Sequence, residues 1–312
     1  MHDVSPQLLR RMLALRQIRL LAGAELNELA MLAENVADAT FVRGAVVARA
    51  GLPLRAIHVV LEGTIASPER GLAWGAHQVF GALEVLSGRP LASAAVATTS
   101  TRTLQLFADD VSDLLDDNFG LLRATLRELA TAALAVPPHH AALAIPDVDP
   151  LGFVDRLLVL RQLAPLSGAR LDGVAMLAQG ATEVVVPPGV ELVRAGEPAP
   201  IGHVIVEGAL AARRATGETR AVHPGDAIGL LELLAGADHG WTVETATRVR
   251  ALECSATAMF DVIEDRTELG IAMIASLAAM LLDIASDSTN GHDRRRTSST
   301  TGGSPPGPSR SW

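Results

Sequence analysis

Two short stretches of the sequence have residue types and a spacing that suit a binding site for a small anion. They are VFGALEVLSGRP (residues 79–90) and AIGLLELLAGAD (residues 227–238), and they nearly repeat each other 148 positions apart. Each has a turn glycine, an apolar run with one glutamate, and a second glycine seven residues on. A glycine turn before a short helix is typical of loops that bind phosphate, yet neither stretch carries a cation where phosphate would need one.

Chemistry beyond binding is not indicated. The sequence has no G-x-S-x-G motif, no P-loop and no histidine spacing typical of a metal centre. Serines are concentrated in the C-terminal tail, away from any base. We therefore expect no enzymatic activity, no metal and no resident cofactor.

The elements that must position the two stretches belong to an internal duplication. Residues 15–63 align with residues 160–208 without a gap at an offset of 145, and 20 of these 49 positions are identical. The following segment is three residues longer in the second copy, so the offset is 148 from Gly81/Gly229 onward. An insertion that leaves both flanks aligned indicates a hairpin loop. The sequence thus predicts two copies of one domain.

Each copy has the same predicted order of elements. Two helical segments with apolar residues at three- and four-residue spacing come first, and short alternating runs between glycine and proline turns follow. After the glycine stretch come more strands and then closing helices. This order predicts a mainly β fold with flanking helices (α+β), in which an antiparallel barrel or jelly roll carries packed helices. The expected division is domain 1 at 1–135, a linker at 136–150, domain 2 at 151–285, and a disordered tail at 286–312.

Composition favours a soluble bacterial protein of the cytoplasm. The net charge of −9 argues against nucleic-acid and anionic-membrane partners. The most apolar helix candidate, residues 269–282, is shorter than the ~20 residues that span a membrane, and the N-terminus lacks a signal-peptide pattern. All 26 basic residues are arginine, which is typical of a GC-rich bacterial genome, and the single Cys254 fits a buried thiol.

Three runs carry a family resemblance. GLPLRAIHVVLEG (51–63), GEPAPIGHVIVEG (196–208) and PGDAIGLLELLAG (224–236) resemble the cyclic nucleotide-binding domain of catabolite-activator-type regulators, protein kinase A regulatory subunits and cyclic nucleotide-gated channels. The resemblance covers nearly the whole chain apart from linker and tail. It implies two tandem β-rolls, each with a phosphate-binding cassette. In that cassette a Gly-Glu pair and a downstream arginine meet the ligand: the arginine pairs with the cyclic phosphate, and the glutamate accepts a bond from the ribose hydroxyl.

Both cassettes depart from this pattern at the glutamate. Gly81 and Gly229 fit the cassette glycine, but the next position holds Ala82 in the first copy and Leu230 in the second. A carboxylate recurs two positions later in both copies, as Glu84 and Glu232. Two roles stay open for this pair: displaced ribose ligands, or helix-start charges that stabilise the helix dipole or cap backbone amides.

The arginine position is also changed. Three residues after the second glycine the two copies have Leu91 and His239, and Arg89 lies two residues out of place. Losing one partner of a buried charge pair costs roughly 2–5 kcal/mol, so binding of cyclic AMP or cyclic GMP is expected to be weak or lost. His58 and His203 stand where the family often has an aromatic, and we interpret both as packed histidines.

The last predicted helix, residues 267–285, is apolar around most of its circumference and must be buried. Its packing partner is its own roll, the other copy, or a second chain in a homodimer. In the tail, Arg294–Arg296 precede Thr297 and Ser298. This run is either a basophilic kinase site or a solvated basic patch.

Two functions are expected from these residues. The first is a non-enzymatic regulatory or adaptor protein that acts through an unknown protein partner. The second is a sensor of cyclic AMP, cyclic GMP or another small ligand with a nonstandard cassette. A distant enzyme on a cupin-like roll ranks third, because the metal-ligand set of such a site is missing.

Overall fold

The computed structural model describes residues 5–18, 21, 24–136 and 143–298, with side chains described as far as residue 286. The first copy begins with two helices, and Ser5 caps the first of them by accepting a hydrogen bond from the Leu8 amide. Its elements are α1 (Pro6–Arg16), α2 (Leu26–Asn35), β1 (Ala37–Phe41), β2 (Val46–Ala48), β3 (Ala56–Glu62), β4 (Ile65–Ser67), the 3-10 turn η2 (Pro68–Arg70), β5 (Leu72–Trp74), β6 (Val79–Phe80), α3 (Ala82–Ser87), β7 (Ala95–Ala97), β8 (Thr101–Phe107), α4 (Ala108–Asp117) and α5 (Phe119–Leu134).

The second copy repeats this order after the linker. Its elements are α6 (Phe153–Arg161), the 3-10 turn η3 (Ala164–Leu166), α7 (Leu171–Gly180), β9 (Thr182–Val186), β10 (Glu191–Val193), β11 (Ile201–Glu207), β12 (Leu210–Arg213), β13 (Thr219–Val222), β14 (Ala227–Ile228), α8 (Leu230–Ala235), β15 (Thr242–Thr245), β16 (Val249–Ser255), α9 (Ala256–Asp265) and α10 (Thr267–Ser298).

Each copy folds into a β-roll of two antiparallel sheets with one strand order. The first roll has sheets β1-β8-β3-β6 and β2-β7-β4-β5, and the second has the matching sheets β9-β16-β11-β14 and β10-β15-β12-β13. The strand pairing confirms the position of the insertion: Ser67 pairs with Leu72 in the first roll, and the matching residues Ala212 and Arg220 pair in the second. The three extra residues therefore lie in the β12–β13 hairpin. The predicted α+β fold with two jelly-roll units is confirmed.

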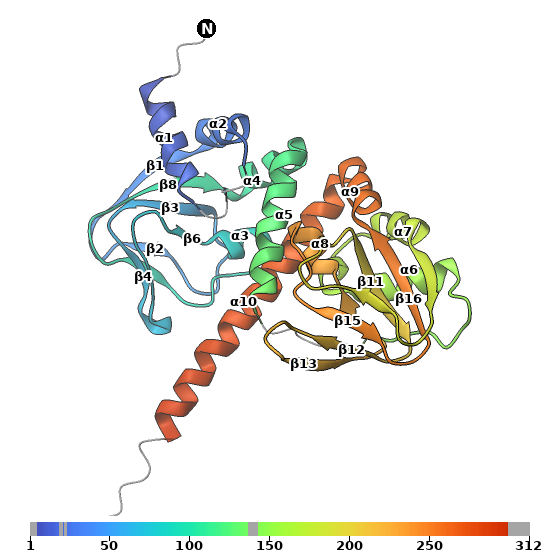
Figure 1. The fold of residues 1–312 in the computed structure, drawn as a ribbon. Coiled ribbons are helices and arrows are strands. Elements are labelled where there is room, and N and C mark those ends of the chain that lie inside the picture. Colours follow the sequence, from blue (N-terminus) through green and yellow to red (C-terminus); the bar gives the residue numbers. More distant parts are fainter. Residues whose placement is uncertain (1–4, 19–20, 22–23, 137–142, 299–312) are drawn as a thin grey trace, which may run out of the picture.

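The helices of the two copies pack across one another between the rolls, as Figure 1 shows. Helix α5 of the first copy packs on α8 of the second, and α10 of the second copy packs on α3 of the first. The two long helices α5 and α10 also pack together. Each roll thus has its glycine-stretch helix covered by the closing helix of the other copy.

This crossed packing has an approximate two-fold axis at the α5–α10 contact. Leu122 and Gly270 occupy equivalent positions at the offset of 148, and they face each other: a Cβ atom on Gly270 would lie 2.6 Å from Leu122 Cδ2. Contact between equivalent positions is the mark of an isologous interface. The largest cluster of buried apolar side chains spans the helices of both copies, while each roll keeps a smaller core of its own.

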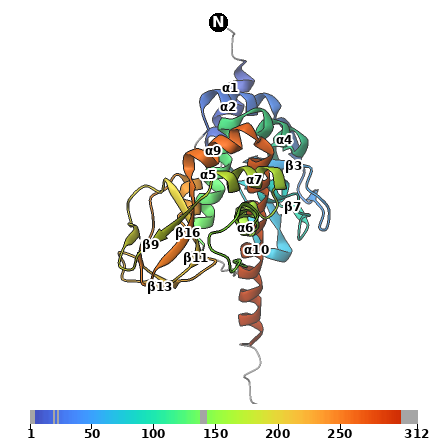
Figure 2. The ribbon, with the colours of Figure 1, turned by 90° about the vertical axis from the view of Figure 1, so that its right-hand side faces the viewer.

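Helix α10 is buried along one face, which includes Leu269, Met273, Ile274 and Leu277. Within the chain it packs on the other copy through α3 and α5 and on its own copy through η3 and α9. Packing against a second chain stays a prediction. Residues 267–286 form one helical segment long and apolar enough to cross a membrane, with 33% of that stretch buried. The core helix of a soluble protein passes the same test, and Figure 2 shows how α10 runs between the two rolls.

The expected tail boundary needs a correction. A disordered tail was predicted from residue 286, but α10 continues to Ser298, so Arg294–Arg296, Thr297 and Ser298 are helical. Residues 286–298 contain no proline, and extending an existing helix costs far less than nucleating a new one. Residues 299–312 lie outside the described residues, as does part of the linker.

Candidate ligand site in the second roll

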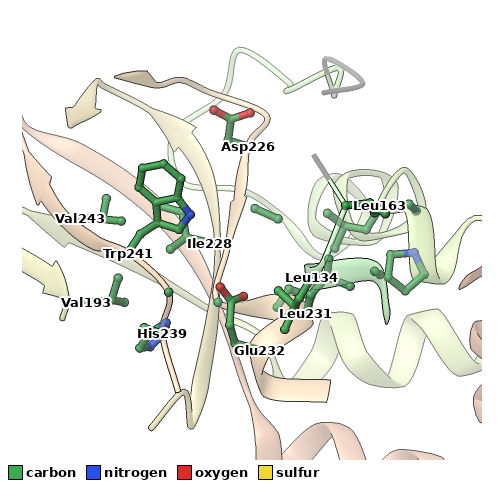
Figure 3. A pocket seen from close by; sticks show the side chains of 18 of the residues that line it. Leu134, Leu163, Val193, Asp226, Ile228, Leu231, Glu232, His239, Trp241 and Val243 are labelled. Carbon is green, nitrogen blue, oxygen red and sulfur yellow. The ribbon is translucent and has the colours of Figure 1, made fainter. Parts of the chain in front are cut away.

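The second roll contains a cavity of about 360 Å³ beside the predicted cassette. This volume lies within the range of small-molecule sites. Strands of the roll, the start of α8, the end of α5 and the middle of α10 enclose it, as the close view in Figure 3 shows in part. Side chains that matter below are Arg214, Arg220, Ile228, Glu232, His239 and Trp241.

The cassette glycine of this roll is held in a conformation that only glycine adopts readily. Gly229 has φ +74°, and a Cβ atom there would lie 2.8 Å from His239 Cε1 and 3.0 Å from the Ile201 carbonyl oxygen. The next residue, Leu230, begins α8 and is buried at the glutamate position of the family pattern. His239 is buried at the arginine position. The structure therefore brings these predicted residues together around the cavity.

The first roll is filled at the matching place. Four positions that hold Ala199, Val222, Ile228 and His239 in the second roll hold larger or more apolar side chains in the first, namely Leu54, Trp74, Phe80 and Leu91. Their side chains join one apolar cluster, in which the Trp74 and Phe80 rings lie 4.9 Å apart. Leu91 is 5% exposed, so the arginine position here is part of a dry core.

The remaining predicted residues of the first cassette contact other parts of the chain. Gly81 has φ +86°, and a Cβ atom there would lie 1.9 Å from Leu54 Cδ2, so Leu54 covers it. Ala82 begins α3. Arg89 points to the other copy and forms an ion pair with Asp283 of α10, with Nη1 and Oδ1 2.5 Å apart. Arg89 therefore ties the two copies together and lies outside the first roll's interior.

The two recurring glutamates differ in their surroundings. Glu232 lines the cavity of the second roll, and Figure 3 shows its carboxylate between His239 and Leu231. Among the described residues, neither Glu84 nor Glu232 has a side-chain hydrogen bond to the helix amides. Glu232 lies both at the cavity and in the first turn of α8, so its two predicted roles stay open.

The sequence interpretation missed two cations of this site. Arg214 and Arg220, from the β12–β13 hairpin, line the cavity and stack on Trp241, with guanidinium carbons 4.3 and 4.9 Å from the indole centroid. Arg214 is paired with Glu218 at 3.0 Å across the hairpin turn. The register of β12 and β13 would have revealed Arg220. Leu210, Ala212 and Val222 are buried on the inner face of these strands. Arg220 pairs directly with Ala212, so it lies on that same inner face.

Both central-strand histidines are buried, which confirms their interpretation as packed residues. His58 lies between the rings of Phe41 and Phe80, at centroid distances of 5.7 and 5.8 Å. His203 Nε2 faces Glu253 Oε1 at 3.3 Å, while its Nδ1 is buried without a hydrogen-bond partner. No group of three histidine, cysteine, aspartate or glutamate residues suited to a metal occurs among the residues the structure describes.

Burial makes the first roll sensitive to acid through His58. Burial lowers the pKa of His58 to about 4, against about 6.5 in an unfolded chain. Between these pH values the unfolded chain binds the proton more strongly than the folded chain. The free energy of unfolding is therefore at its full value above about pH 6.5 and falls as the pH is lowered toward 4. Urea unfolding at about pH 7.5 and about pH 5 should show a loss of about 1–2 kcal/mol from this residue. His58→Asn should reduce the loss, and an unchanged pH dependence in that variant would contradict the assignment.

The second roll matches a known protein family. The family model described as "Cyclic nucleotide-binding domain" matches residues 183–266, within the second copy. A search of curated proteins gave no match. The regulatory domain of Toxoplasma gondii protein kinase A, co-crystallised with cAMP, is 16% identical, with 92% of this chain and 99% of that chain covered and a TM-score of 0.35.

Two further solved structures are similar. The regulatory subunit of a cAMP-independent protein kinase A from Trypanosoma cruzi, bound to guanosine, is 17% identical, with 88% of this chain and 87% of that chain covered and a TM-score of 0.36. The N-terminal domain of a transcriptional regulator from Streptomyces coelicolor A3(2) is 24% identical, with 40% of this chain and 94% of that chain covered and a TM-score of 0.37. The chain thus contains two β-rolls of one topology, and the family match lies in the second.

Proposed function

We propose that the protein is a non-enzymatic regulatory protein with one small-ligand site per chain, located in the second roll. The first roll serves as a filled structural unit, and standard binding of cyclic AMP or cyclic GMP is weak because both cassettes lack the glutamate and the arginine. The observation that carries the proposal is the contrast between matched positions: Phe80 and Leu91 pack in the core of the first roll, whereas Ile228 and His239 line a cavity in the second.

Two helices that line this cavity also contact the other copy of the domain. Leu134 of α5 and Met280 of α10 both line the cavity, and α10 also packs on α3 of the first copy. A ligand that displaces either side chain would change the packing between the two copies. This arrangement suits a protein that reports ligand occupancy to a protein partner through its helices.

Titration calorimetry with cyclic AMP, cyclic GMP, adenosine and guanosine, each at millimolar concentration, tests the proposal. We expect saturable heat with at least one compound and no more than one site per chain. The double variant Ile228→Phe/His239→Leu, which introduces the first roll's residues into the second, should abolish that heat. The matched control Arg213→Gln changes an exposed arginine of β12 and should leave it unchanged.

Two results would contradict the proposal. Two sites per chain, or binding unaffected by the double variant, would place ligand outside the second roll. Heat from none of the four compounds would favour the second candidate, an adaptor that works through protein contacts alone. The loss of the standard glutamate and arginine from both cassettes is the observation that supports this adaptor function.

A further inference from the structure

The β12–β13 hairpin carries a cation, Arg220, that forms no ion pair with a carboxylate among the described residues. Arg220 is half-buried beside the cavity. Its Nε is buried without a hydrogen-bond partner. Arg11 and Arg156 also have an unpaired Nε, but their other nitrogens donate to the backbone carbonyls of Ala33 and Ala181. Arg220 therefore has a guanidinium nitrogen beside the cavity whose hydrogen bond the described residues leave unmade.

The neighbours of Arg220 hold it in place without neutralising it. Its guanidinium carbon lies 4.9 Å from the centroid of Trp241, whose ring attracts a cation. The second guanidinium on the same ring, that of Arg214, already pairs with Glu218. Of the two arginines at this indole, Arg220 is the one that forms no ion pair among the described residues. The carboxylates of Asp226, Glu232 and Asp238 line the same cavity.

The two copies of the chain support this assignment, because the arginines and the cavity occur together. At the positions of Arg220 and Trp241 the filled first roll has Leu72 and Ser93. The hairpin that carries Arg214 and Arg220 is also the one that is three residues longer in the second copy. The roll with the open cavity is thus the roll with the arginine pair.

We propose that Arg220 binds the anionic group of the ligand, in place of the cassette arginine that both copies lack. A planar guanidinium edge with Nε and one Nη matches a phosphate or carboxylate in a bidentate geometry. Glu232, on the α8 side of the cavity, accepts a hydrogen bond from a hydroxyl or amino group of the same ligand. The ligand class is therefore a small organic anion with at least one hydroxyl or amino donor. This inference rests on the proposed function of the second roll.

Pairs of ligands that differ only in the phosphate test it. Cyclic AMP against adenosine, and cyclic GMP against guanosine, are titrated into the full chain and followed by calorimetry and by the fluorescence of Trp241 in a Trp74→Phe/Trp312→Phe background. The cyclic nucleotide should bind roughly 10- to 100-fold more tightly than its nucleoside. Arg220→Gln should remove this preference, Arg220→Lys should retain part of it, and the exposed control Arg213→Gln should leave it intact.

The outcomes separate this inference from the proposed function. Equal binding of nucleoside and nucleotide in the wild type, blocked by Ile228→Phe/His239→Leu, would leave the ligand site in place and overturn the role of Arg220. A phosphate preference that survives Arg220→Gln would overturn it as well. Binding of none of the four compounds would count against both. Circular dichroism of each variant checks that a loss of binding comes from a folded chain.

Discussion

Leu91→Arg is expected to lower the free energy of unfolding by at least about 4 kcal/mol, whereas His239→Arg at the equivalent position of the second copy should change it by no more than about 1 kcal/mol. Leu91 is 5% exposed and packs in the cluster of Ile65 and Phe80. A guanidinium there would lose its hydration and find no partner. His239 borders a cavity of about 360 Å³, so a longer cation there has space and access to water.

Urea unfolding of the two variants, measured beside the wild type, checks this prediction. Leu91→Met, which keeps volume and polarity nearly constant, should cost less than about 1.5 kcal/mol and so shows that the charge is the cause. Equal destabilisation by Leu91→Arg and His239→Arg would mean that the two rolls are packed alike, and the distinction between a filled and an open roll would fail.

The second large effect is expected at Arg250. This arginine is buried in the second copy, whereas its equivalent in the first copy, Arg102, is exposed. Arg250 is 5% exposed, and its Nη2 lies 2.6 Å from Glu183 Oε1 and donates to the Val148 carbonyl oxygen at 2.9 Å. Removing it would leave the largely buried Glu183 carboxylate without a counter-charge, with only the Leu151 amide still donating to it. Arg250→Met should therefore cost about 3–5 kcal/mol of unfolding free energy.

The matched control is Arg102→Met in the first copy. Arg102 and Glu62 form an ion pair at 2.9 Å, but their side chains are 53% and 66% exposed, and exposed pairs contribute only about 0–1 kcal/mol. The double variant Arg250→Met/Glu183→Leu should recover most of the stability lost in Arg250→Met, since no unpaired charge remains. If Arg250→Met and Arg102→Met lowered the free energy of unfolding equally, in thermal or urea unfolding, burial of the ion pair would not be the cause of the large loss expected at Arg250.

Most of the fold could be predicted because the sequence contains two copies of one domain that can be aligned with each other. An offset that holds at 145 and then at 148 identified the repeat and placed the insertion in a hairpin, and the strand pairing agrees. Gly81 and Gly229 marked the turns before α3 and α8. Both have a positive φ, which glycine adopts readily and other residues adopt only at a steric cost. The crossed packing of α5 and α10 was beyond local patterns, since apolar helices show only that they are buried.

The candidate site was predicted less completely. The residues Ala82, Leu91, Leu230 and His239 predicted nonstandard cassettes, but they suggested the same outcome for both rolls. What separates the rolls is side-chain volume at positions distant in sequence, such as Leu54 over Gly81. The cation was missed because Arg220 reaches the cavity from a neighbouring strand, where only the register of β12 and β13 reveals its direction.

The central claim, that one copy of the domain has closed its pocket while the other has kept it, can be tested without any ligand. Crystals pressurised with xenon, which enters apolar cavities of sufficient size, should show xenon in the second roll beside Ile228 and Val243 and none between Trp74, Phe80 and Leu91. Xenon within that cluster of the first roll, or an equal absence from both rolls, would contradict the account.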